Sequence, residues 1–177
     1  WSAYAKGIGN AKKLVLDTDG AEANTGGWNS TNPTNTLFSH GGYYDSDKII
    51  YYAFHSVKGY SKISQYTGNG DNGNGTFIYT GFKPAMVMIK RSDAQGNWVV
   101  FDSIRSPFNT ADNAVSWDMS DREYTSADGV VGIDMLSNGF KCKDNHTTRN
   151  AAGGVYQYLA IAENPFVTST AIPATAR

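Results

Sequence analysis

The sequence predicts an all-β protein, an antiparallel β-sandwich built from two related halves, and three observations lead to this prediction. Short runs rich in Val, Ile, Tyr and Phe alternate with clusters of Gly, Asn, Asp and Pro. The 177 residues include 19 Gly and 13% aromatic residues but only 18% charged residues, a balance typical of strands and turns rather than of long surface helices. Finally, a stretch in the first half of the chain resembles one in the second half.

The apolar runs are the expected strands because each is short and bounded by turn residues. In chain order they are Val15–Leu16, Ile49–Phe54, Thr76–Thr80, Met86–Lys90, Trp98–Phe101 and Val155–Ala162. The expected turns are the clusters Thr25–Gly27, Ser39–Gly42, Gly68–Gly75, Ser137–Gly139 and Ala152–Gly154, where Gly and Asn adopt positive φ at low cost.

A β-hairpin is the best defined local prediction. Ala94–Asn97 separates the apolar runs that end at Ile89 and begin at Trp98, and its Gly and Asn suit a turn between two largely buried strands. A short stretch at Asn109–Met119 is the only candidate helix, with Thr110 as a possible cap, but its periodicity is weak. We therefore expect a loop or a single turn there.

The internal repeat appears when the segment starting at Trp1 is aligned with the segment starting at Trp98. The alignment places Trp1–Tyr4 on Trp98–Phe101. Downstream it places Leu37–Gly41 on Met135–Gly139, and Ile50–Phe54 on Gln157–Ile161. The repeat predicts two units, 1–62 and 63–177, packed as one compact domain or as two closely joined sandwiches.

The first repeat unit lacks an arm that the second unit has. Lys83–Arg91 precedes Trp98 and pairs with it in the expected hairpin, but no such segment precedes Trp1. If both units share one fold, Trp1, Ser2, Ala3 and Tyr4 form an edge strand without a partner, which upstream residues or a neighbouring subunit would complete.

Charge and cysteine content exclude several classes of function. The formal net charge is −1, so no electrostatic attraction towards nucleic acid or an anionic membrane is expected. The only cysteine, Cys142, can form neither an internal disulfide nor a Cys/His metal cluster. The sequence shows no long apolar span and no signal-peptide pattern, so neither is expected.

Paired carboxylates for glycoside hydrolysis are not evident. Such enzymes need two acids facing each other across a cleft, whereas Glu22, Glu123 and Glu163 lie in loops or at a strand end. Asp17-Thr18-Asp19 and Asp45-Ser46-Asp47 place carboxylates two residues apart. Both segments are better explained as a turn and a hairpin tip, so a polysaccharide depolymerase is the weakest hypothesis.

Nucleophilic and metal sites are also not predicted. The histidines, His40, His55 and His146, are scattered, and no Gly-x-Ser-x-Gly elbow occurs. Two lysines flank Cys142 and favour a lower thiol pKa, although a half-buried strand position explains the residue more simply. The loop Asn69–Asn74 is rich in oxygen donors but lacks the bidentate acid of a calcium loop. We therefore expect no catalytic residue, no metal and no cofactor.

Three aromatic residues in predicted loops are the candidate contact residues. Trp28, Tyr43 and Tyr44 could stack on sugar rings or pack into a partner subunit. The alternative is that they fold back onto their own sandwich.

Several segments resemble a family of uncharacterised virion and tail-fibre proteins of tailed phages. The resemblance spans nearly the whole chain and is carried by Gly59–Gly70, Phe77–Arg91, Asn97-Trp98, Asp102-Ser103, Arg105–Pro107, Leu136–Phe140, Ala162–Phe166 and Thr168–Arg177. It implies a concanavalin-A-like, jelly-roll sandwich and a place in the virion, but no catalytic residues. Related proteins continue upstream with a strand of the Pro-x-Met-Ile-Ile-Val-Lys type, so the resemblance also implies that this chain is part of a longer polypeptide.

These observations predict a non-enzymatic structural protein of the virion, in a tail fibre or as a decoration of the capsid or tail surface. Its expected partners are other copies of itself and other virion proteins, with no nucleic acid and no membrane. The alternative is a carbohydrate-binding module that recognises host surface glycans. Host attachment and assembly are compatible, since one face can dock while another recognises.

Overall fold

The computed structural model describes residues 1–41, 49–129 and 131–165, and this part of the chain is all-β. The strands are β1 (Ser2–Ala3), β2 (Lys12–Val15), β3 (Ala23–Asn24), β4 (Ser61–Thr67), β5 (Phe77–Tyr79), β6 (Pro84–Arg91), β7 (Val99–Asp102), β8 (Ala114–Ser116), β9 (Ile133–Leu136), β10 (Gly139–Cys142) and β11 (Val155–Ala162). A single 3₁₀ turn, η2 (Ser126–Asp128), is the one helical element among the described residues. The predicted all-β class is confirmed, whereas the jelly-roll detail of the prediction is not.

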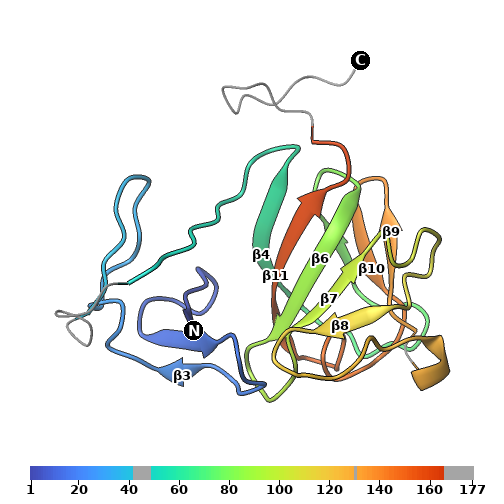
Figure 1. The fold of residues 1–177 in the computed structure, drawn as a ribbon, viewed down its shortest axis with the longest axis horizontal. Helices are drawn as coiled ribbons and strands as arrows, with labels where there is room; N and C mark the ends of the chain where they lie inside the picture. Colours follow the sequence, from blue (N-terminus) through green and yellow to red (C-terminus); the bar gives the residue numbers. More distant parts are fainter. Residues whose placement is uncertain (42–48, 130, 166–177) are drawn as a thin grey trace.

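The centre of the molecule is a five-stranded antiparallel sheet in the order β4-β11-β6-β7-β8 (Figure 1). β11 is flanked on both sides, with Leu159 opposite Ile63 of β4 and opposite Met88 of β6. A three-stranded sheet in the order β5-β10-β9 faces it. Together the two sheets form a β-sandwich, which covers residues from β4 to β11.

The core between these sheets follows from the alternation of side chains along each strand. On β11, Tyr156, Tyr158 and Ala160 point inwards, and Phe140 of β10 meets Tyr158 from the facing sheet with ring centroids 5.5 Å apart. Every member of the buried apolar cluster lies at or after Tyr66. The described first third of the chain therefore contributes nothing to this core.

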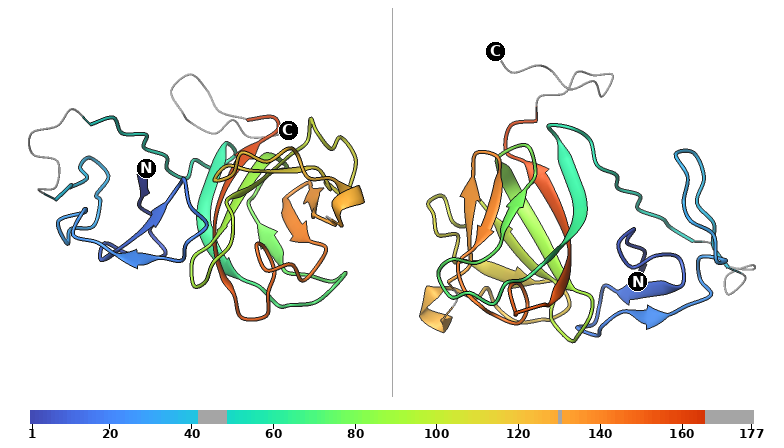
Figure 2. Two further views of the ribbon diagram at one scale, coloured as in Figure 1. Left: turned by 60° about the horizontal axis from the view of Figure 1, so that its bottom comes forward. Right: turned by 180° about the vertical axis from the view of Figure 1, so that it is seen from behind.

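The N-terminal residues form a separate three-stranded sheet, in the order β1-β2-β3, beside the sandwich (Figure 2). Its attachment lies at the β6–β7 hairpin. The Nζ atom of Lys90 donates hydrogen bonds to the carbonyl oxygens of Asp19, Gly20 and Gly96 at 3.0, 2.7 and 2.7 Å. The indole Nε1 of Trp98 donates to the carbonyl of Val15 at 2.9 Å. We call residues 1–57 the N-terminal region and 58–165 the sandwich.

Several predicted strands are confirmed, among them Val155–Ala162, which is β11, and Met86–Lys90, which lies within β6. The predicted hairpin also forms, since Val87 of β6 pairs with Phe101 of β7. The prediction for Ile49–Phe54 is wrong for the described chain: this run belongs to no strand and is largely exposed. An apolar alternating run forms a strand only where another strand offers its edge, and none of the described strands lies beside this one.

Four strands of the sandwich were not predicted, namely β4, β8, β9 and β10. They are short, or they mix polar and apolar residues, so their apolar signal is weak; β4 reads Ser-Lys-Ile-Ser-Gln-Tyr-Thr. The stretch Asn109–Met119 is a loop that contains β8, which agrees with the expected loop but not with a single turn of helix. Thr76–Thr80 contains β5, and Val15–Leu16 begins at the last residue of β2.

The two related halves are not confirmed. Trp98–Phe101 is buried in the sandwich, whereas the aligned Trp1–Tyr4 lies at the edge of the small sheet with Trp1 exposed. Gln157–Ile161 occupies β11 between two strands, whereas the aligned Ile50–Phe54 is unpaired among the described residues. Similar residue patterns in these segments therefore lie in different structural surroundings.

Candidate assembly surface

Large apolar side chains of the N-terminal region are exposed and lie against one another. Ile50, Tyr52 and Phe54 are 67%, 71% and 66% exposed. Trp1 and Leu37 are exposed to a similar extent, and Phe38 and Tyr51 are exposed for almost half of their surface. Clustered exposure of this kind marks an interaction site in soluble proteins more often than chance exposure does. We call these residues the apolar surface.

The segment 49–54 is the centre of the apolar surface. It runs as an extended trace from the N-terminal region towards the start of β4 (Figure 1). Its sequence, Ile-Ile-Tyr-Tyr-Ala-Phe, carries no charge. Within the described residues, no hydrogen bond involves the backbone of this segment. An extended, uncharged segment with available backbone groups has the properties of a strand that can pair with another chain.

The side chains of segment 49–54 have different surroundings. The ring of Tyr51 packs edge-on against Phe38, with centroids 4.5 Å apart, and lies 6.0 Å from His40. This contact holds one face of the segment against residues 37–41. Tyr52 instead lies 5.9 Å from Trp1, and the Ile50 and Phe54 side chains are about two thirds exposed. Tyr51 is thus held by its neighbours, whereas Ile50, Tyr52 and Phe54 remain largely open to solvent.

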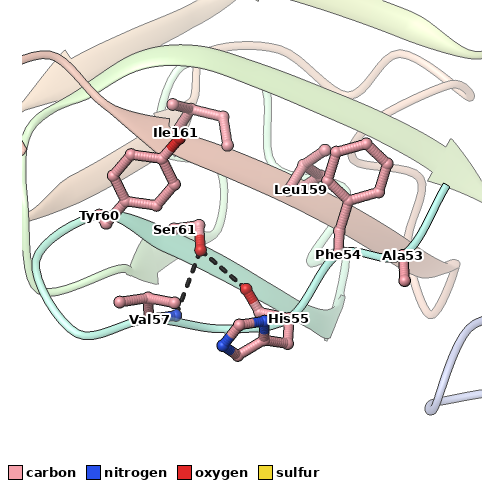
Figure 3. A pocket seen from close by; sticks show the side chains of 8 residues that line it. All are labelled: Ala53, Phe54, His55, Val57, Tyr60, Ser61, Leu159 and Ile161. Carbon is pink, nitrogen blue, oxygen red and sulfur yellow. Dashed lines mark hydrogen bonds between the residues drawn. The ribbon is translucent and has the colours of Figure 1, made fainter. Parts of the chain in front are cut away.

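Hydrogen bonds fix the end of the segment to the edge strand β4. The hydroxyl of Ser61 donates to the carbonyl of His55 at 2.8 Å, and the N–H of Val57 donates to the Ser61 Oγ at 3.2 Å (Figure 3). Ser56 bonds in both directions with the backbone of Ile63 at 2.9 and 3.2 Å. These bonds cover the first part of the outer edge of β4 and set the direction in which residues 49–54 leave it.

A shallow apolar hollow of about 130 Å³ lies where the segment meets the outer face of β4 and β11. Phe54 stands over Leu159 on one side, and Tyr60 stands beside Ile161 on the other (Figure 3). Ala53, His55, Val57 and Ser61 complete the lining. Since most of these side chains are apolar, the hollow suits an aliphatic or aromatic side chain rather than a polar ligand.

The predicted edge strand lies at the edge of the small sheet. Ser2 and Ala3 pair with Val15 and Leu14 of β2, and on the other side no described strand pairs with them. The second edge of this sheet is β3. Ser2 and Ala3 are therefore paired on one side only among the described residues, Tyr4 follows the strand, and Trp1 joins the apolar surface through its contact with Tyr52.

The loop aromatics have different settings. Trp28 is half-buried: its Nε1 donates to the carbonyl of Lys12 at 2.8 Å, and its ring meets Tyr4 edge-on at 5.8 Å. These contacts correspond to the self-packing alternative. Tyr43 and Tyr44 lie outside the described residues.

The reactive side chains of the sandwich take part in structural contacts. Burial raises the pKa of the Cys142 thiol to about 11, so the flanking lysines do not activate it and the thiol is inert near neutral pH. His146 shares a 2.9 Å hydrogen bond with the Thr148 hydroxyl, and burial lowers its pKa. Arg149 and Asp144 form a buried ion pair. His40 and His55 lie apart from this group, in the N-terminal region.

A second, polar hollow of about 320 Å³ lies beside the β6–β7 hairpin. Its charged side chains already have partners. Arg91 pairs with Asp93 at 3.1 Å, and the Asp19 carboxylate accepts a 2.6 Å hydrogen bond from Gln95. Both charged side chains of the hollow therefore already have a polar partner within the protein.

The loop Asn69–Asn74 uses its oxygen donors internally. The Asn69 side chain accepts from the N–H of Asp71 at 3.0 Å, and the Asp71 carboxylate accepts from the N–H of Asn74 at 3.2 Å. Over the described ranges, no three His, Cys, Asp or Glu side chains gather as a metal site would require. In the same ranges, the chain contains no helix with the length and apolarity that a membrane crossing demands.

The sequence did not reveal the apolar surface because Ile49–Phe54 was interpreted as a strand of the sandwich. Its chemical signal, an uncharged aromatic run, is the same for a core strand and for an exposed contact strand.

A search of curated proteins and a search of solved structures each find no match. A family model, described as a domain of unknown function (DUF7483), matches residues 1–165. Since this match covers most of the chain, the protein belongs to the DUF7483 family.

Proposed function

We propose that the protein is a non-enzymatic structural subunit that assembles with other protein subunits through its N-terminal region. The observation that carries this proposal is the apolar surface centred on segment 49–54. Its large apolar side chains are exposed and gather against one another, with Tyr51 against Phe38 and Tyr52 against Trp1. Water contact with so many aromatic groups is unfavourable, and burial against a partner removes it.

The second part of the proposal places this subunit in a phage virion, as a tail-fibre component or a decoration of the capsid or tail surface. This part is supported by the sequence resemblance to phage virion and tail-fibre proteins, carried by Phe77–Arg91 and the other quoted segments. The small net charge of −1 agrees with a partner that is protein rather than nucleic acid or membrane.

A non-enzymatic role is supported by the way the reactive groups are used. The Cys142 thiol is buried with a raised pKa, and His146 is held by Thr148. The oxygen-rich loop Asn69–Asn74 satisfies its own polar groups. A site for chemistry normally leaves such groups open to a substrate, so these side chains are better explained as parts of the fold.

The alternative, a carbohydrate-binding module for host surface glycans, has weaker support. The Trp28 indole N–H donates to the carbonyl of Lys12, and the Trp28 ring packs against Tyr4 in a T-shaped contact. A sugar-stacking platform needs an open aromatic face. A glycan array probed with the protein tests this alternative, together with the variant Tyr43→Ala/Tyr44→Ala: a signal that the double variant abolishes would favour glycan binding over assembly.

The experiment that tests assembly is sedimentation velocity of the full chain over a wide range of concentration, followed by binding to purified virion components. We expect concentration-dependent association or binding to a virion protein. A monodisperse monomer at every concentration that also fails to bind any virion component would refute the proposed function.

A further inference from the structure

We infer that Asn74 is a site of spontaneous modification, where the side-chain amide becomes a carboxylate through a cyclic imide formed with the backbone nitrogen of Gly75. The inference goes beyond the proposed assembly function and does not depend on it. It follows from the hydrogen bonds that the fold makes at each Asn-Gly pair of the chain.

The sequence contains four such pairs, which are Asn69-Gly70, Asn72-Gly73, Asn74-Gly75 and Asn138-Gly139. In each pair the glycine nitrogen can attack the side-chain Cγ of the preceding asparagine, because glycine has no Cβ to hinder the approach. The new N–C bond closes the imide and ammonia leaves. Water then opens the imide to aspartate or to isoaspartate. Since all four pairs share this local chemistry, differences between them arise from the fold.

The glycine nitrogens of two pairs are held by hydrogen bonds. The N–H of Gly70 donates to the carbonyl of Asn150 at 3.0 Å. The N–H of Gly73 donates to the carbonyl of Lys143 at 3.1 Å. Each nitrogen must lose this bond before it can attack, so the fold protects the asparagines that precede Gly70 and Gly73.

The pair Asn138-Gly139 is held through its carbonyl group. The carbonyl of Asn138 accepts hydrogen bonds from the N–H groups of Thr80 and Gly81 at 3.0 and 3.1 Å. Gly139 is also the first residue of β10. These contacts oppose the rotation of the peptide group that ring closure requires.

The pair Asn74-Gly75 lacks this protection. Within residues 1–41, 49–129 and 131–165, the N–H of Gly75 donates no hydrogen bond. Its nitrogen therefore has no protein contact to give up before it attacks. The Asn74 side chain is exposed, so ammonia can leave and water can reach the imide.

Lys141 activates the Asn74 amide. Its Nζ atom donates a 2.6 Å hydrogen bond to the Asn74 Oδ1. Attack on Cγ moves negative charge onto this oxygen, and an ammonium already bonded to it stabilises that charge. In the described chain, no Lys or Arg side chain donates to the side-chain amide of the other three asparagines. The fold thus combines a free nucleophile and an activated carbonyl at one pair only.

The modification would change the loop in a way that depends on the product. Aspartate adds one negative charge that faces Lys141. Isoaspartate also inserts a methylene into the main chain before Gly75, where space is short. A Cβ at Gly75 would meet the Cys142 carbonyl oxygen at 2.5 Å and the Asn150 Nδ2 at 2.7 Å. We therefore expect isoaspartate to loosen the loop and aspartate to preserve it.

Peptide mapping by mass spectrometry tests the inference in the full chain. The protein is incubated at mildly alkaline pH, folded and in urea, and acid formation is measured at each Asn-Gly pair. In urea we expect the four pairs to react at similar rates. In the folded protein we expect residue 74 to react first, with the other three slower than in urea. A folded chain in which another pair reacts first would overturn the inference.

A lysine substitution tests the activation. Lys141→Met should slow the reaction at Asn74 about fivefold in the folded protein, as loss of one exposed charged contact implies. It should not alter the rate in urea. Lys143→Met is the matched control, because Lys143 forms an ion pair with Asp134 at 3.3 Å instead. Circular dichroism with thermal unfolding verifies that both variants fold. A folded-state rate that is unchanged or raised in Lys141→Met would contradict the inference.

The same maps identify the attacking atom. Attack by the neutral amine of Lys141 would also release ammonia, but it would join residues 74 and 141 by an isopeptide bond. A cross-linked peptide would overturn the inference, since the Gly75 nitrogen would not be the nucleophile. Aspartate and isoaspartate at residue 74, without a cross-link, would support it.

Hydrogen exchange tests the expected effect of isoaspartate. The amide of Asn69 donates to the Asn150 Oδ1 at 3.1 Å, beside the loop. Its exchange should accelerate in incubated protein that contains isoaspartate and stay unchanged in Asn74→Asp. Equal exchange in both samples would contradict the loosening of the loop.

Discussion

The N-terminal region and the core of the sandwich place their aromatic residues differently. In the sandwich, Phe140, Tyr66 and Tyr158 form a buried cluster with ring centroids 5.5 to 6.1 Å apart. In the N-terminal region, Tyr52 and Phe54 are exposed. Leu14 is the one buried apolar side chain of the described residues before position 58. A region rich in apolar residues but almost without a core leaves many of them in contact with water, and the proposed assembly function is based on this exposure.

The two regions also differ in how they are held. The sandwich is closed by long strand ladders, such as those on both sides of β11. The small sheet has strands no longer than the four residues of β2 and depends on the contacts made by Lys90 and Trp98. A sheet this small is marginally stable on its own. We therefore expect the two regions to respond differently to matched substitutions.

The largest expected difference is between two phenylalanines. Phe140→Ala removes a fully buried ring from the core and should lower the free energy of unfolding by about 3–5 kcal/mol. Phe54→Ala removes an exposed ring and should change it by less than about 0.5 kcal/mol. Urea unfolding of both variants, at a concentration where the chain is monomeric, measures the difference. Similar losses for both would show that Phe54 belongs to a core.

The next largest effect concerns the attachment between the regions. Lys90→Met leaves three carbonyl oxygens without a donor and should cost about 2–3 kcal/mol. The loss should be local. Native-state hydrogen exchange should accelerate at the amides of Glu22 and Gly96, which bond across the junction to Ser92 and Asp19.

A matched control for this variant is Lys83→Met, because Lys83 forms a partly exposed ion pair with Glu163. We expect unchanged exchange at the junction in that variant. If Lys90→Met unfolds the sandwich together with the N-terminal region, the two regions are a single cooperative unit rather than a core with an attached sheet.

The pH dependence of stability provides a further test of Lys90. Burial lowers its pKa to about 8, so near neutral pH the ammonium is protonated and its three N–H groups donate. Between pH 8 and the unfolded pKa of about 10.4, the unfolded chain holds more protons than the folded chain. Stability should therefore rise with pH in this window.

This rise should be absent from the Lys90→Met variant. Unfolding midpoints of both proteins at pH 7, 8.5 and 9.5 measure the difference, in which the contributions of other titrating groups cancel. A difference that stays constant across this range would show that the Lys90 pKa is not lowered.

The smallest expected effect is within the small sheet. Trp28→Phe removes the hydrogen bond from Nε1 to the carbonyl of Lys12 and should weaken the N-terminal sheet by about 1 kcal/mol. Trp117→Phe is the control, since Trp117 is half exposed in the sandwich. Hydrogen exchange at the amides of Lys12 and Asn24, which lie opposite each other in the β2–β3 pair, measures the local change. A global loss of stability would mean that Trp28 supports more than its own sheet.

The sequence by itself determined the all-β class, the β6–β7 hairpin and β11. These features follow from local patterns, because a continuous apolar run bounded by Gly, Asn and Pro forms a buried strand in almost any sandwich. The absence of a catalytic pattern was likewise a local inference, made from the spacing of Asp, His and Cys. It remains a prediction, supported by the internal contacts of Cys142 and His146.

Only the tertiary structure decided what lies opposite each run. Ile49–Phe54 and Val155–Ala162 have similar local patterns, yet β11 is paired on both sides while residues 49–54 are exposed. The burial of Lys90, at a position where a charged residue is expected to be exposed, depends on carbonyl groups contributed by residues 19 and 20 of the N-terminal region. The physical reason is the same in both cases: strand pairing and burial are contacts between residues distant in the sequence, and a local pattern does not contain its partner.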